Sequence, residues 1–359
     1  MRVHVVGGGP AGSIAALSAL RHGHEVILSE EHSCAGLPVH CSGLFSKDGL
    51  ERLKDFIDYK KLVINPIYGA MVNLAGVRLD IQRSPPVAFV CDRSELDATL
   101  AKNAENEGVN VEYDKKITGN FASNYIIGAD GPFSSIARQL NFPQISKYAA
   151  TLQADLSYAC EDPHKVEVYL SNEKFPGFFA WVIPHSEEEA EFGVGVVLPH
   201  SVNKAWRALL KMKGVSYAGT PKGAVIPIRA RPKTAVTHGK YRVCLVGDAA
   251  GQTKATTGGG VIFGGQCGML AGKYITDPWK YEFAWKLKHG AELSFHRWVQ
   301  GYLEHQSDAQ LRRIGQLLQQ AGAEEYLSRH GHMDRPLHML GFPFLTHLIS
   351  LPFKRVVRG

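Results

Sequence analysis

Several features that would place the chain in a special class are missing from the sequence. Its six cysteines form no Cys-x-x-Cys pair and no closely spaced framework: Cys34, Cys41, Cys91, Cys160, Cys244 and Cys267. This spacing excludes the usual zinc sites and disulfide scaffolds, and we expect a reducing, cytoplasmic environment. The two His-Gly-His triplets, at residues 22–24 and 330–332, have no carboxylate or helical partner placed to complete a metal site. We therefore expect no bound metal.

Long apolar runs and concentrated charge are also missing. No uncharged apolar stretch reaches the roughly 18 residues that a membrane-spanning helix needs. The first residues, MRVHVVGGGP, enter a predicted strand directly, without the pattern of a signal peptide. The net charge of +6 is spread along the chain, which suits anionic cofactors or a membrane surface but is too diffuse for nucleic acid. We expect a soluble protein, or one peripheral to the cytoplasmic face of a membrane.

The N-terminal segment VHVVGGGPAGSIAALSALRHGHEVILSEE predicts a strand, a tight glycine turn, a helix and a second strand. Its turn carries the pattern G-x-G-x-x-G, and the residues expected to contact a ligand are Gly7, Gly9, Pro10, Ala11 and Gly12. The glycines of this pattern allow the turn, the approach of a pyrophosphate and close packing of helix on strand. Glu30 follows at the distance where a carboxylate accepts the ribose hydroxyls. The segment predicts a bound dinucleotide without distinguishing NAD from FAD.

Three later segments resemble motifs of the glutathione-reductase-like FAD proteins, in the branch that includes the aromatic hydroxylases. VCDRSELDATL carries Arg93 in an R-x-x-L-D pattern, YIIGADGPFSS carries Asp130 and Gly131, and VCLVGDAAG carries Gly247 and Asp248. The resemblance implies FAD as the cofactor, with Asp248 holding its ribityl chain. An alternative role for Asp248 is that of a helix N-cap.

A glycine run follows the last of these motifs and opens a predicted helix. The resemblance places this helix against the flavin ring, and the residues implied in cofactor contacts there are Gly258, Gly259, Gly260 and Val261. Ile117 is implied near the adenine. A glycine run at a helix start also indicates close approach of the backbone to a ligand.

The expected fold is α/β: a Rossmann-like FAD-binding domain with an inserted antiparallel β-sheet domain and a helical C-terminal region. The FAD segments are expected at 1–56, 90–145 and 235–280. The inserts at 57–89 and 146–234 alternate as strands, including a hairpin around Gly76. Residues 281–359 show helical periodicity.

The inserted strands carry a second resemblance, to the geranylgeranyl reductase family. FPGFFAWVIP is similar to the family's aromatic-x-Trp-x-Phe-Pro motif, with Phe179 in place of Tyr and Ile183 in place of Phe, and a G-x-G follows at Gly193 and Gly195. GLPVHCSGLFS resembles the family's cysteine turn and contains Cys41 and Ser42, both implied in flavin contacts. The resemblance implies Phe179 and Trp181 as substrate-binding residues and Cys41 and Trp181 as catalytic. The alternatives are aromatic core packing for the pair and a small buried filler for Cys41.

These features favour an FAD-dependent reductase that saturates isolated C=C bonds of polyprenyl groups on isoprenoid membrane-lipid precursors. The alternatives are a flavin monooxygenase or halogenase, or a flavin electron carrier without a reaction of its own. One dinucleotide fingerprint implies a transient electron donor: a nicotinamide, a deazaflavin or a ferredoxin. The tail, residues 337–359, places Leu337, Leu340, Phe344 and Leu348 on one helical face before three basic residues, which predicts either membrane contact or docking onto the protein's own core.

Overall fold

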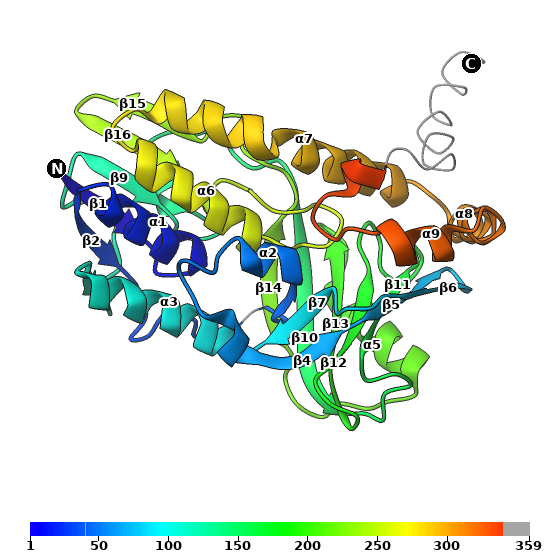
Figure 1. The fold of residues 1–359 in the computed structure, drawn as a ribbon. Coiled ribbons are helices and arrows are strands. Elements are labelled where there is room, and N and C mark those ends of the chain that lie inside the picture. Colours follow the sequence, from blue (N-terminus) through cyan, green and yellow to red (C-terminus); the bar gives the residue numbers. More distant parts are fainter. Residues whose placement is uncertain (40, 340–359) are drawn as a thin grey trace, which may run out of the picture.

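Three β-sheets organise the computed structural model, which describes residues 1–39 and 41–339 (Figure 1). The first sheet has the strand order β15-β16-β9-β1-β2-β8 and is parallel except for the β15–β16 pair. Its strands are β1 (Arg2–Val6), β2 (Glu25–Ser29), β8 (Asn110–Glu112), β9 (Tyr125–Gly128), β15 (Ala235–His238) and β16 (Tyr241–Leu245). The order matches the Rossmann-like sheet predicted from the sequence.

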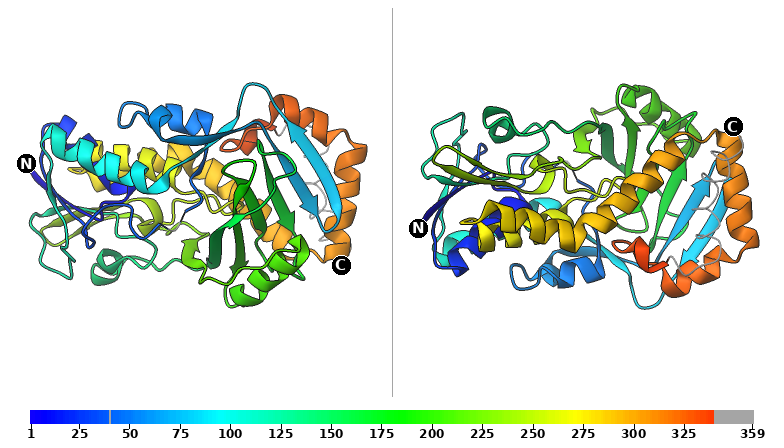
Figure 2. Two further views of the ribbon diagram at one scale, coloured as in Figure 1. Left: turned by 90° about the horizontal axis from the view of Figure 1, so that it is seen from below. Right: turned by 90° about the horizontal axis from the view of Figure 1, so that it is seen from above.

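Helices α1 (Pro10–Arg21), α3 (Arg93–Glu107) and α6 (Val261–Tyr274) accompany this sheet. α1 and α6 lie side by side (Figures 1 and 2) because α6 presents a row of glycines to α1. A Cβ at Gly268 would lie 2.4 Å from the Ala11 carbonyl oxygen, and one at Gly272 would lie 2.6 Å from that of Ala15. The contact therefore brings the starts of two helices to the same edge of the sheet.

The second sheet has seven strands in the order β14-β10-β13-β12-β11-β5-β6. Its strands are β5 (Gly69–Leu74), β6 (Val77–Gln82), β10 (Tyr148–Ser157), β11 (Lys165–Leu170), β12 (Ala180–Pro184), β13 (Glu189–Val197) and β14 (Lys222–Pro227). The hairpin expected around Gly76 is confirmed as β5–β6. The expectation of a wholly antiparallel sheet is wrong at one pair, since β11 runs parallel to β5. These two strands come from different inserts, so no hairpin turn dictates their direction.

The two faces of the second sheet pack against different partners. One face is covered by α5 (Val202–Lys213), through Trp206 and Leu209. The other face packs against a small antiparallel sheet, β3-β7-β4, and in this layer Trp181 and Ile183 contact Val90. The small sheet consists of β3 (Leu44–Ser46), β4 (Val63–Ile67) and β7 (Ala88–Cys91). Trp181 thus lies on the face turned toward the middle of the molecule.

The long helix α7 (Pro278–Glu304) passes both larger sheets (Figure 2). Near its start the Tyr281 hydroxyl donates to the Leu245 carbonyl of β16 at 2.6 Å, and near its end the Gln300 amide donates to the Gly177 carbonyl at 3.1 Å. The other short elements are α2 (Lys47–Glu51), α4 (Ser135–Gln139), α8 (Asp308–Gln320), α9 (Ala323–His330), η1 (Tyr59–Leu62), η2 (Gly247–Ala249) and η3 (Pro336–Met339). The predicted fold class, including the helical C-terminal region, is confirmed.

Two sequence-based statements remain predictions. The exact division into FAD-binding, inserted and C-terminal domains is one of them. The apolar and basic face of the tail is the other, because most of it falls on residues 340–359, outside the described residues. None of the helices within residues 1–39 and 41–339 has the length and apolar character that a bilayer crossing requires.

Candidate active site

The first βα turn leaves an open, positively polarised helix start. Gly7 adopts φ +103°, and a Cβ there would lie 2.3 Å from the Ala129 carbonyl oxygen. A Cβ at Gly9 would meet no atom within 4 Å, and α1 has no side-chain cap. The Glu30 side chain lies against this turn, since its Oε2 accepts from the Gly8 N–H at 2.7 Å. The first N–H groups of α1 therefore face free space of the kind a pyrophosphate fills.

A second uncapped helix start lies beside the first. α6 begins after Gly260 with no side-chain cap and no acidic residue in its first turn. Gly247 is adjacent to α1, because a Cβ at Gly247 would lie 2.9 Å from the Cβ of Ala11. The two helix starts with Gly247 between them make one region that attracts negative charge.

Asp248 lies in this region as a carboxyl group without a protein partner. Burial raises the pKa of Asp248 to about 6, and the positive charge of Arg93 partly opposes that rise. Its Oδ1 lies 3.0 Å from the position of a Cβ on Gly260, and its side chain makes no hydrogen bond with the described residues. The N-cap role is wrong, because the side chain caps neither η2 nor α6. Its free acceptors fit the hydroxyls of a ribityl chain.

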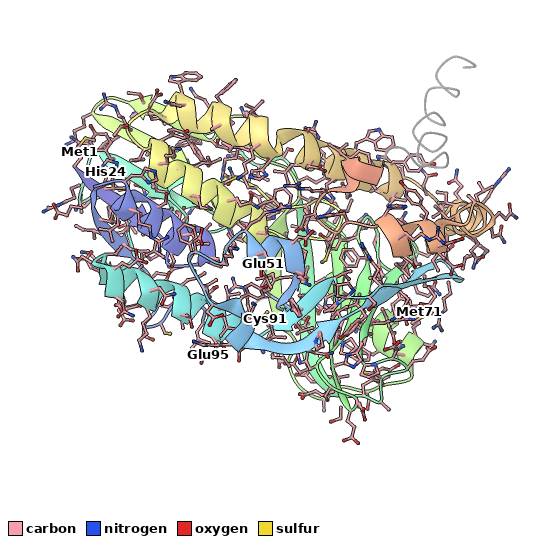
Figure 3. The ribbon with its side chains drawn as sticks, viewed as in Figure 1. Met1, His24, Glu51, Met71, Cys91 and Glu95 are labelled. Atoms are coloured by element: carbon pink, nitrogen blue, oxygen red, sulfur yellow. The ribbon has the colours of Figure 1, made fainter. Side chains whose placement is uncertain are left out.

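Arg93 connects Asp248 with Cys41. It begins α3, just beyond Cys91 and before Glu95 (Figure 3), and pairs with Asp97 one turn later. The Nε of Arg93 is buried without a hydrogen-bond partner. Burial raises the pKa of the Cys41 thiol, and the Arg93 charge opposes this rise. The predicted residues Arg93, Cys41 and Asp248 are thus within electrostatic reach of one another, and the buried Nε is an unused donor.

The Asp130 motif positions backbone rather than offering a free carboxylate. Asp130 accepts hydrogen bonds from the Ser134 hydroxyl at 2.6 Å and from the Ser135 N–H at 2.7 Å, which fixes the start of α4. Gly131 beside it has φ +76°, and a Cβ there would meet nothing within 4 Å. Ile117 packs with Ile136 in a buried cluster beneath the same loop. Open space in this motif therefore adjoins the Gly131 backbone.

The glycine run packs against the protein itself. A Cβ at Gly258 would lie 3.0 Å from Cδ1 of Ile226, and one at Gly259 would lie 2.8 Å from Cε of Lys254. A Cβ at Gly260 would lie 2.8 Å from Cγ2 of Thr253. Close packing restricts the side chains possible at these positions, Gly258 also adopts φ +70°, and the ligand approach predicted from the sequence stays a prediction. Val261 then starts α6, and Ser42 is half-buried beside Cys41.

A buried ion pair that sequence reasoning missed anchors this loop. The Nζ of Lys254 lies 2.6 Å from Oδ1 of Asp334, and both side chains are almost fully buried. The Ser46 hydroxyl donates to the other oxygen of the Asp334 carboxylate. The three residues come from the loop, the C-terminal segment and the small sheet, so no sequence spacing connects them.

The rings of the predicted aromatic pair lie close together, and Gly193 of the G-x-G motif makes room for one of them. The rings of Phe179 and Trp181 have centroids 5.5 Å apart. A Cβ at Gly193 would lie 2.0 Å from the Trp181 ring, and one at Gly195 would lie 2.2 Å from the ring of Phe178. The two glycines thus let aromatic rings lie directly on β13. Trp181 is also part of a buried cluster, so core packing accounts for its position, and its role at a substrate surface stays a prediction.

Glu191 is a second residue that sequence reasoning missed. Its Oε1 accepts from Nε1 of Trp181 at 2.9 Å, and its Oε2 accepts from the Gln153 amide at 2.9 Å. Burial raises the pKa of Glu191 to about 8, and the bond from Trp181 opposes the rise. The charge of Glu191 in turn raises the pKa of Cys41. The available signal was a carboxylate two residues before Gly193, in a strand that is apolar beyond Glu191.

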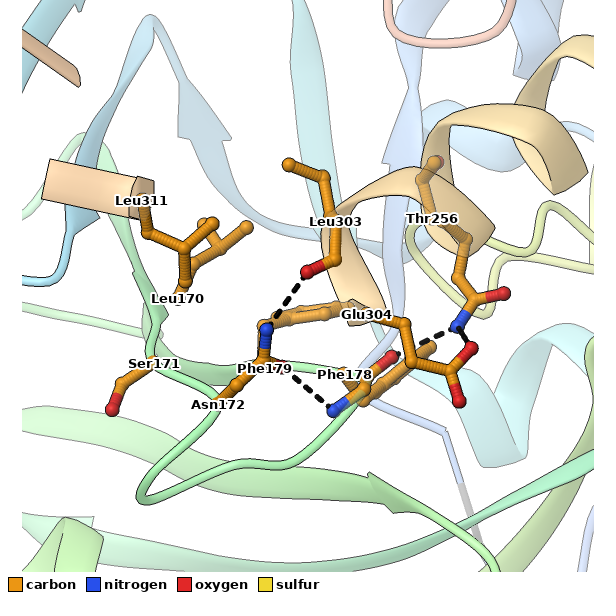
Figure 4. Close-up of a pocket in the computed structure, with 11 residues that line it drawn as sticks. Leu170, Ser171, Asn172, Phe178, Phe179, Thr256, Leu303, Glu304 and Leu311 are labelled. Atoms are coloured by element: carbon orange, nitrogen blue, oxygen red, sulfur yellow. Dashed lines mark hydrogen bonds between the residues drawn. The ribbon is translucent and has the colours of Figure 1, made fainter. Parts of the chain in front are cut away.

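An apolar pocket adjoins the aromatic pair (Figure 4). It lies between the loop before β12, the glycine loop and the ends of α7 and α8. Its walls are Leu170, Ser171, Asn172, Gly177, Phe178, Phe179, Thr256, Gln300, Leu303, Glu304 and Leu311. Hydrogen bonds across its rim, such as that from Asn172 Nδ2 to the Leu303 carbonyl at 2.8 Å, hold the polar groups to one another. The remaining wall is formed by five hydrophobic side chains, Leu170, Phe178, Phe179, Leu303 and Leu311.

Comparison with known proteins agrees with this geometry. The model of FAD-dependent oxidoreductases matches residues 2–124, and that of an FAD-binding domain matches residues 103–266. These two matches show an FAD-dependent oxidoreductase. FAD is its cofactor, and the two open helix starts, the unpartnered Asp248 carboxyl and the unused Arg93 Nε fit that group.

The relatives of this oxidoreductase include reductases of geranylgeranyl groups. It is 27% identical to digeranylgeranylglycerophospholipid reductase 2 of Methanothermobacter thermautotrophicus, over 87% of this chain and 91% of the relative. It is 28% identical to geranylgeranyl diphosphate reductase of Rhodobacter capsulatus, over 97% of each chain. Among solved structures, a geranylgeranyl bacteriochlorophyll reductase-like protein of Thermoplasma acidophilum shares the fold, with a TM-score of 0.76, 22% identity and coverage of 88% and 90%. The predicted resemblance is confirmed.

Proposed function

We propose that this oxidoreductase saturates isolated C=C bonds of polyprenyl groups, on precursors of isoprenoid membrane lipids. The observation that carries the proposal is the aromatic surface of Phe179 and Trp181, which adjoins an apolar pocket beside the glycine loop. The names of the two curated relatives support a lipid substrate for this chain.

An isolated trisubstituted alkene restricts the order of events. The chemistry that reduced FAD supplies, when bound, is hydride transfer to an alkene carbon. A hydride added first would leave a carbanion that no adjacent carbonyl stabilises, so a proton must arrive earlier or together with it. Positive charge then develops on the more substituted carbon. An aromatic face stabilises such a cation by about 2 kcal/mol or more when water is excluded, and Trp181 and Phe179 present those faces.

We propose that Cys41 donates the proton and that Glu191 then reprotonates Cys41. Burial raises the pKa of both groups, so both hold their protons at neutral pH. Glu191 is held by hydrogen bonds from Trp181 and Gln153, and once it is ionised its charge raises the pKa of Cys41. The nearby Arg93 would favour proton loss from Cys41. Glu191 would then donate a proton to Cys41 and restore its thiol. Each bond reduced then takes one hydride and one proton and becomes a C–C single bond.

The cofactor contacts are proposed residue by residue. The pyrophosphate and ribose would be held by the first βα turn with Glu30, and the ribityl chain by Asp248 and Arg93. The flavin ring would lie against Gly258, Gly259, Gly260, Val261, Cys41 and Ser42, with Ile117, Asp130 and Gly131 near the nucleotide half. The same chain carries one dinucleotide fingerprint, which supports a transient reductant: a nicotinamide, a deazaflavin or a ferredoxin.

Anaerobic turnover tests the proposal. Enzyme reduced with dithionite is mixed with a geranylgeranyl lipid in heavy water without oxygen, and the product is analysed by mass spectrometry. We expect two solvent deuteriums for each bond saturated, one added as the proton and one as the hydride, because the transferable hydrogen on N5 of reduced FAD exchanges with heavy water. A strict requirement for oxygen would assign the chain to the monooxygenase or halogenase alternative. Reduced enzyme that reoxidises with electron acceptors but never with the lipid would make it an electron carrier.

A further inference from the structure

The first half of α7 leaves a row of large apolar side chains in solvent. Trp279, Phe283 and Leu287 are 67%, 67% and 75% exposed. Their spacing of four residues places them on one face of the helix. The opposite face is anchored in the core by Tyr281 and Trp285. A monomeric protein rarely exposes several large apolar side chains together without a partner for them.

Lysines surround this row. Lys280, Lys286 and Lys288 are exposed on the same half of α7, and Lys273 is exposed just before it. Lys233, from the segment before β15, holds its Nζ 5.3 Å from the centre of the Trp279 ring. Two carboxylates lie nearby: Asp277 caps α7, and Glu282 is buried in a pair with Lys286. Lys288 lies on the side of the helix that carries Tyr281, so four lysines against two carboxylates give the α7 face, defined by Trp279, Phe283, Leu287 and those four lysines, a positive border.

We propose that the α7 face docks on an anionic lipid surface. Apolar side chains flanked by lysines are the pattern of helices that lie in a membrane interface, and tryptophan is favoured at that depth because its ring is amphipathic. Each lysine near an anionic surface contributes about 1 kcal/mol. A second copy of the chain fits less well, because a twofold contact through this face would bring the lysine borders of both copies together.

This docking does not depend on the proposed reaction. The α7 face shares no residue with the candidate active site, and lipid binding can be measured without turnover. If the reaction is as proposed, docking would hold the enzyme at the surface that contains its substrate. A failed turnover experiment would leave vesicle binding intact, and failed vesicle binding would leave turnover with detergent-solubilised lipid intact.

Vesicle flotation with the full-length holoenzyme tests the proposal. The probes are vesicles of phosphatidylcholine alone and vesicles containing phosphatidylglycerol. We expect binding to the anionic vesicles that decreases with added salt. The double variant Phe283→Ser/Leu287→Ser should weaken binding more than tenfold, since each side chain loses its burial in the interface. Lys280→Glu should weaken it about fivefold or more.

The matched control is Ile64→Ser/Met212→Ser, which removes two exposed apolar side chains elsewhere on the surface. It should bind vesicles like the wild type, and the flavin absorbance of every variant reports that it is folded. The proposal is overturned if the wild type does not bind anionic vesicles, or if the α7 variants bind as tightly as the control. It is also overturned if ultracentrifugation shows a vesicle-indifferent dimer that Phe283→Ser/Leu287→Ser converts to monomers.

Discussion

Trp181 combines two properties at the level of one residue. Its ring lies flat over Gly193, and its Nε1 donates to the buried carboxyl of Glu191. In the proposed reaction the ring would offer an electron-rich face to a developing cation, whereas the N–H fixes the ring's orientation. These two properties are separable by substitution, because phenylalanine keeps an aromatic face and loses the donor.

Replacing Trp181 with leucine should slow alkene reduction about tenfold or more, since the loss of a cation–π contact of about 2 kcal/mol raises the barrier. Trp181→Phe should keep more of the rate than Trp181→Leu. The measurement is anaerobic stopped-flow reoxidation of reduced enzyme by the lipid. Trp206→Leu is the control, because Trp206 is equally buried on the opposite face of the same sheet. Equal rates for Trp181→Leu and wild type would remove the ring from the mechanism.

Glu191 should impose a pH dependence with a defined sign. Its pKa of about 8 in the folded protein lies above the ordinary 4.5, so the folded state holds a proton that the unfolded state releases between these values. The unfolding free energy should therefore fall as pH rises from about 4.5 to 8, by up to ~1.4 kcal/mol per pH unit. The reduction rate should also fall as pH rises through about 8, because Glu191 has then lost the proton that it would donate to Cys41.

Glu191→Gln should remove both effects, and urea unfolding and stopped-flow rates measured across this pH range check it. Glu167→Gln is the control, since Glu167 is also buried in the second sheet but pairs with Lys213. A Glu191→Gln variant that retains the wild-type rate profile would assign the reprotonation of Cys41 to another group.

The two helix starts form the anion-binding part of the site at the level of elements. Neither α1 nor α6 carries a side-chain cap, and Gly247 lies between them. Uncapped N–H groups attract phosphate and electron-rich ring atoms because the helix dipole adds to their donors. In the proposed cofactor site, the acids at the edges of this region, Glu30 and Asp248, would accept hydrogen bonds from the ribose and ribityl hydroxyls.

Glu30→Ala should weaken FAD binding by about 1.5 to 3 kcal/mol, because it removes hydrogen bonds to a charged group, and Asp248→Ala should do the same. Isothermal titration of the flavin-free protein with FAD measures the change. Glu31→Ala is the matched control: Glu31 is the next residue, but it pairs with Lys116 at the surface. A Glu30→Ala variant with wild-type affinity would place the ribose elsewhere.

Local chemistry made most of the FAD part of the site predictable. Gly7 needs a positive φ, and Gly12 has no room for a Cβ beside the Gly7 carbonyl. Both requirements restrict these positions to glycine, and the glycines are visible in the sequence. Glu191 and the Lys254–Asp334 pair left no comparable signal, since their meaning depends on partners from distant segments. The parallel pairing of β11 with β5 escaped prediction for the same reason. The role of a carboxylate such as Glu191 can be inferred only once its hydrogen-bond donors are known.

The whole molecule depends on contacts between its end and its middle. The Lys254–Asp334 pair ties the segment after α9 to the glycine loop, and Ser46 joins it from the small sheet. The Lys254 charge holds the pKa of Asp334 below its usual range despite burial, which alone would raise it. The segment after α9 therefore helps to hold the glycine loop in place.

Asp334→Ala should destabilise the protein by about 3 to 5 kcal/mol, because it leaves a buried ammonium group without a counter-charge. The double variant Lys254→Met/Asp334→Leu should recover most of this loss. Urea unfolding followed by circular dichroism measures both. Glu325→Ala, which breaks an exposed pair with Arg329, should change stability by less than about 1 kcal/mol. A comparable loss in Glu325→Ala would show that the effect is not specific to the buried pair.

The pairing of β5 with β11 has a consequence for how the chain is made. The β5–β6 hairpin leaves the ribosome well before β11, its neighbour in the second sheet, has been synthesised. During that interval the β5 edge is an open row of backbone donors and acceptors, a template for pairing with another chain. Long-range pairing of this kind also slows folding, because a large loop must close first. Nascent chains halted between these strands should therefore be the species most prone to aggregate, and most dependent on chaperones, during expression.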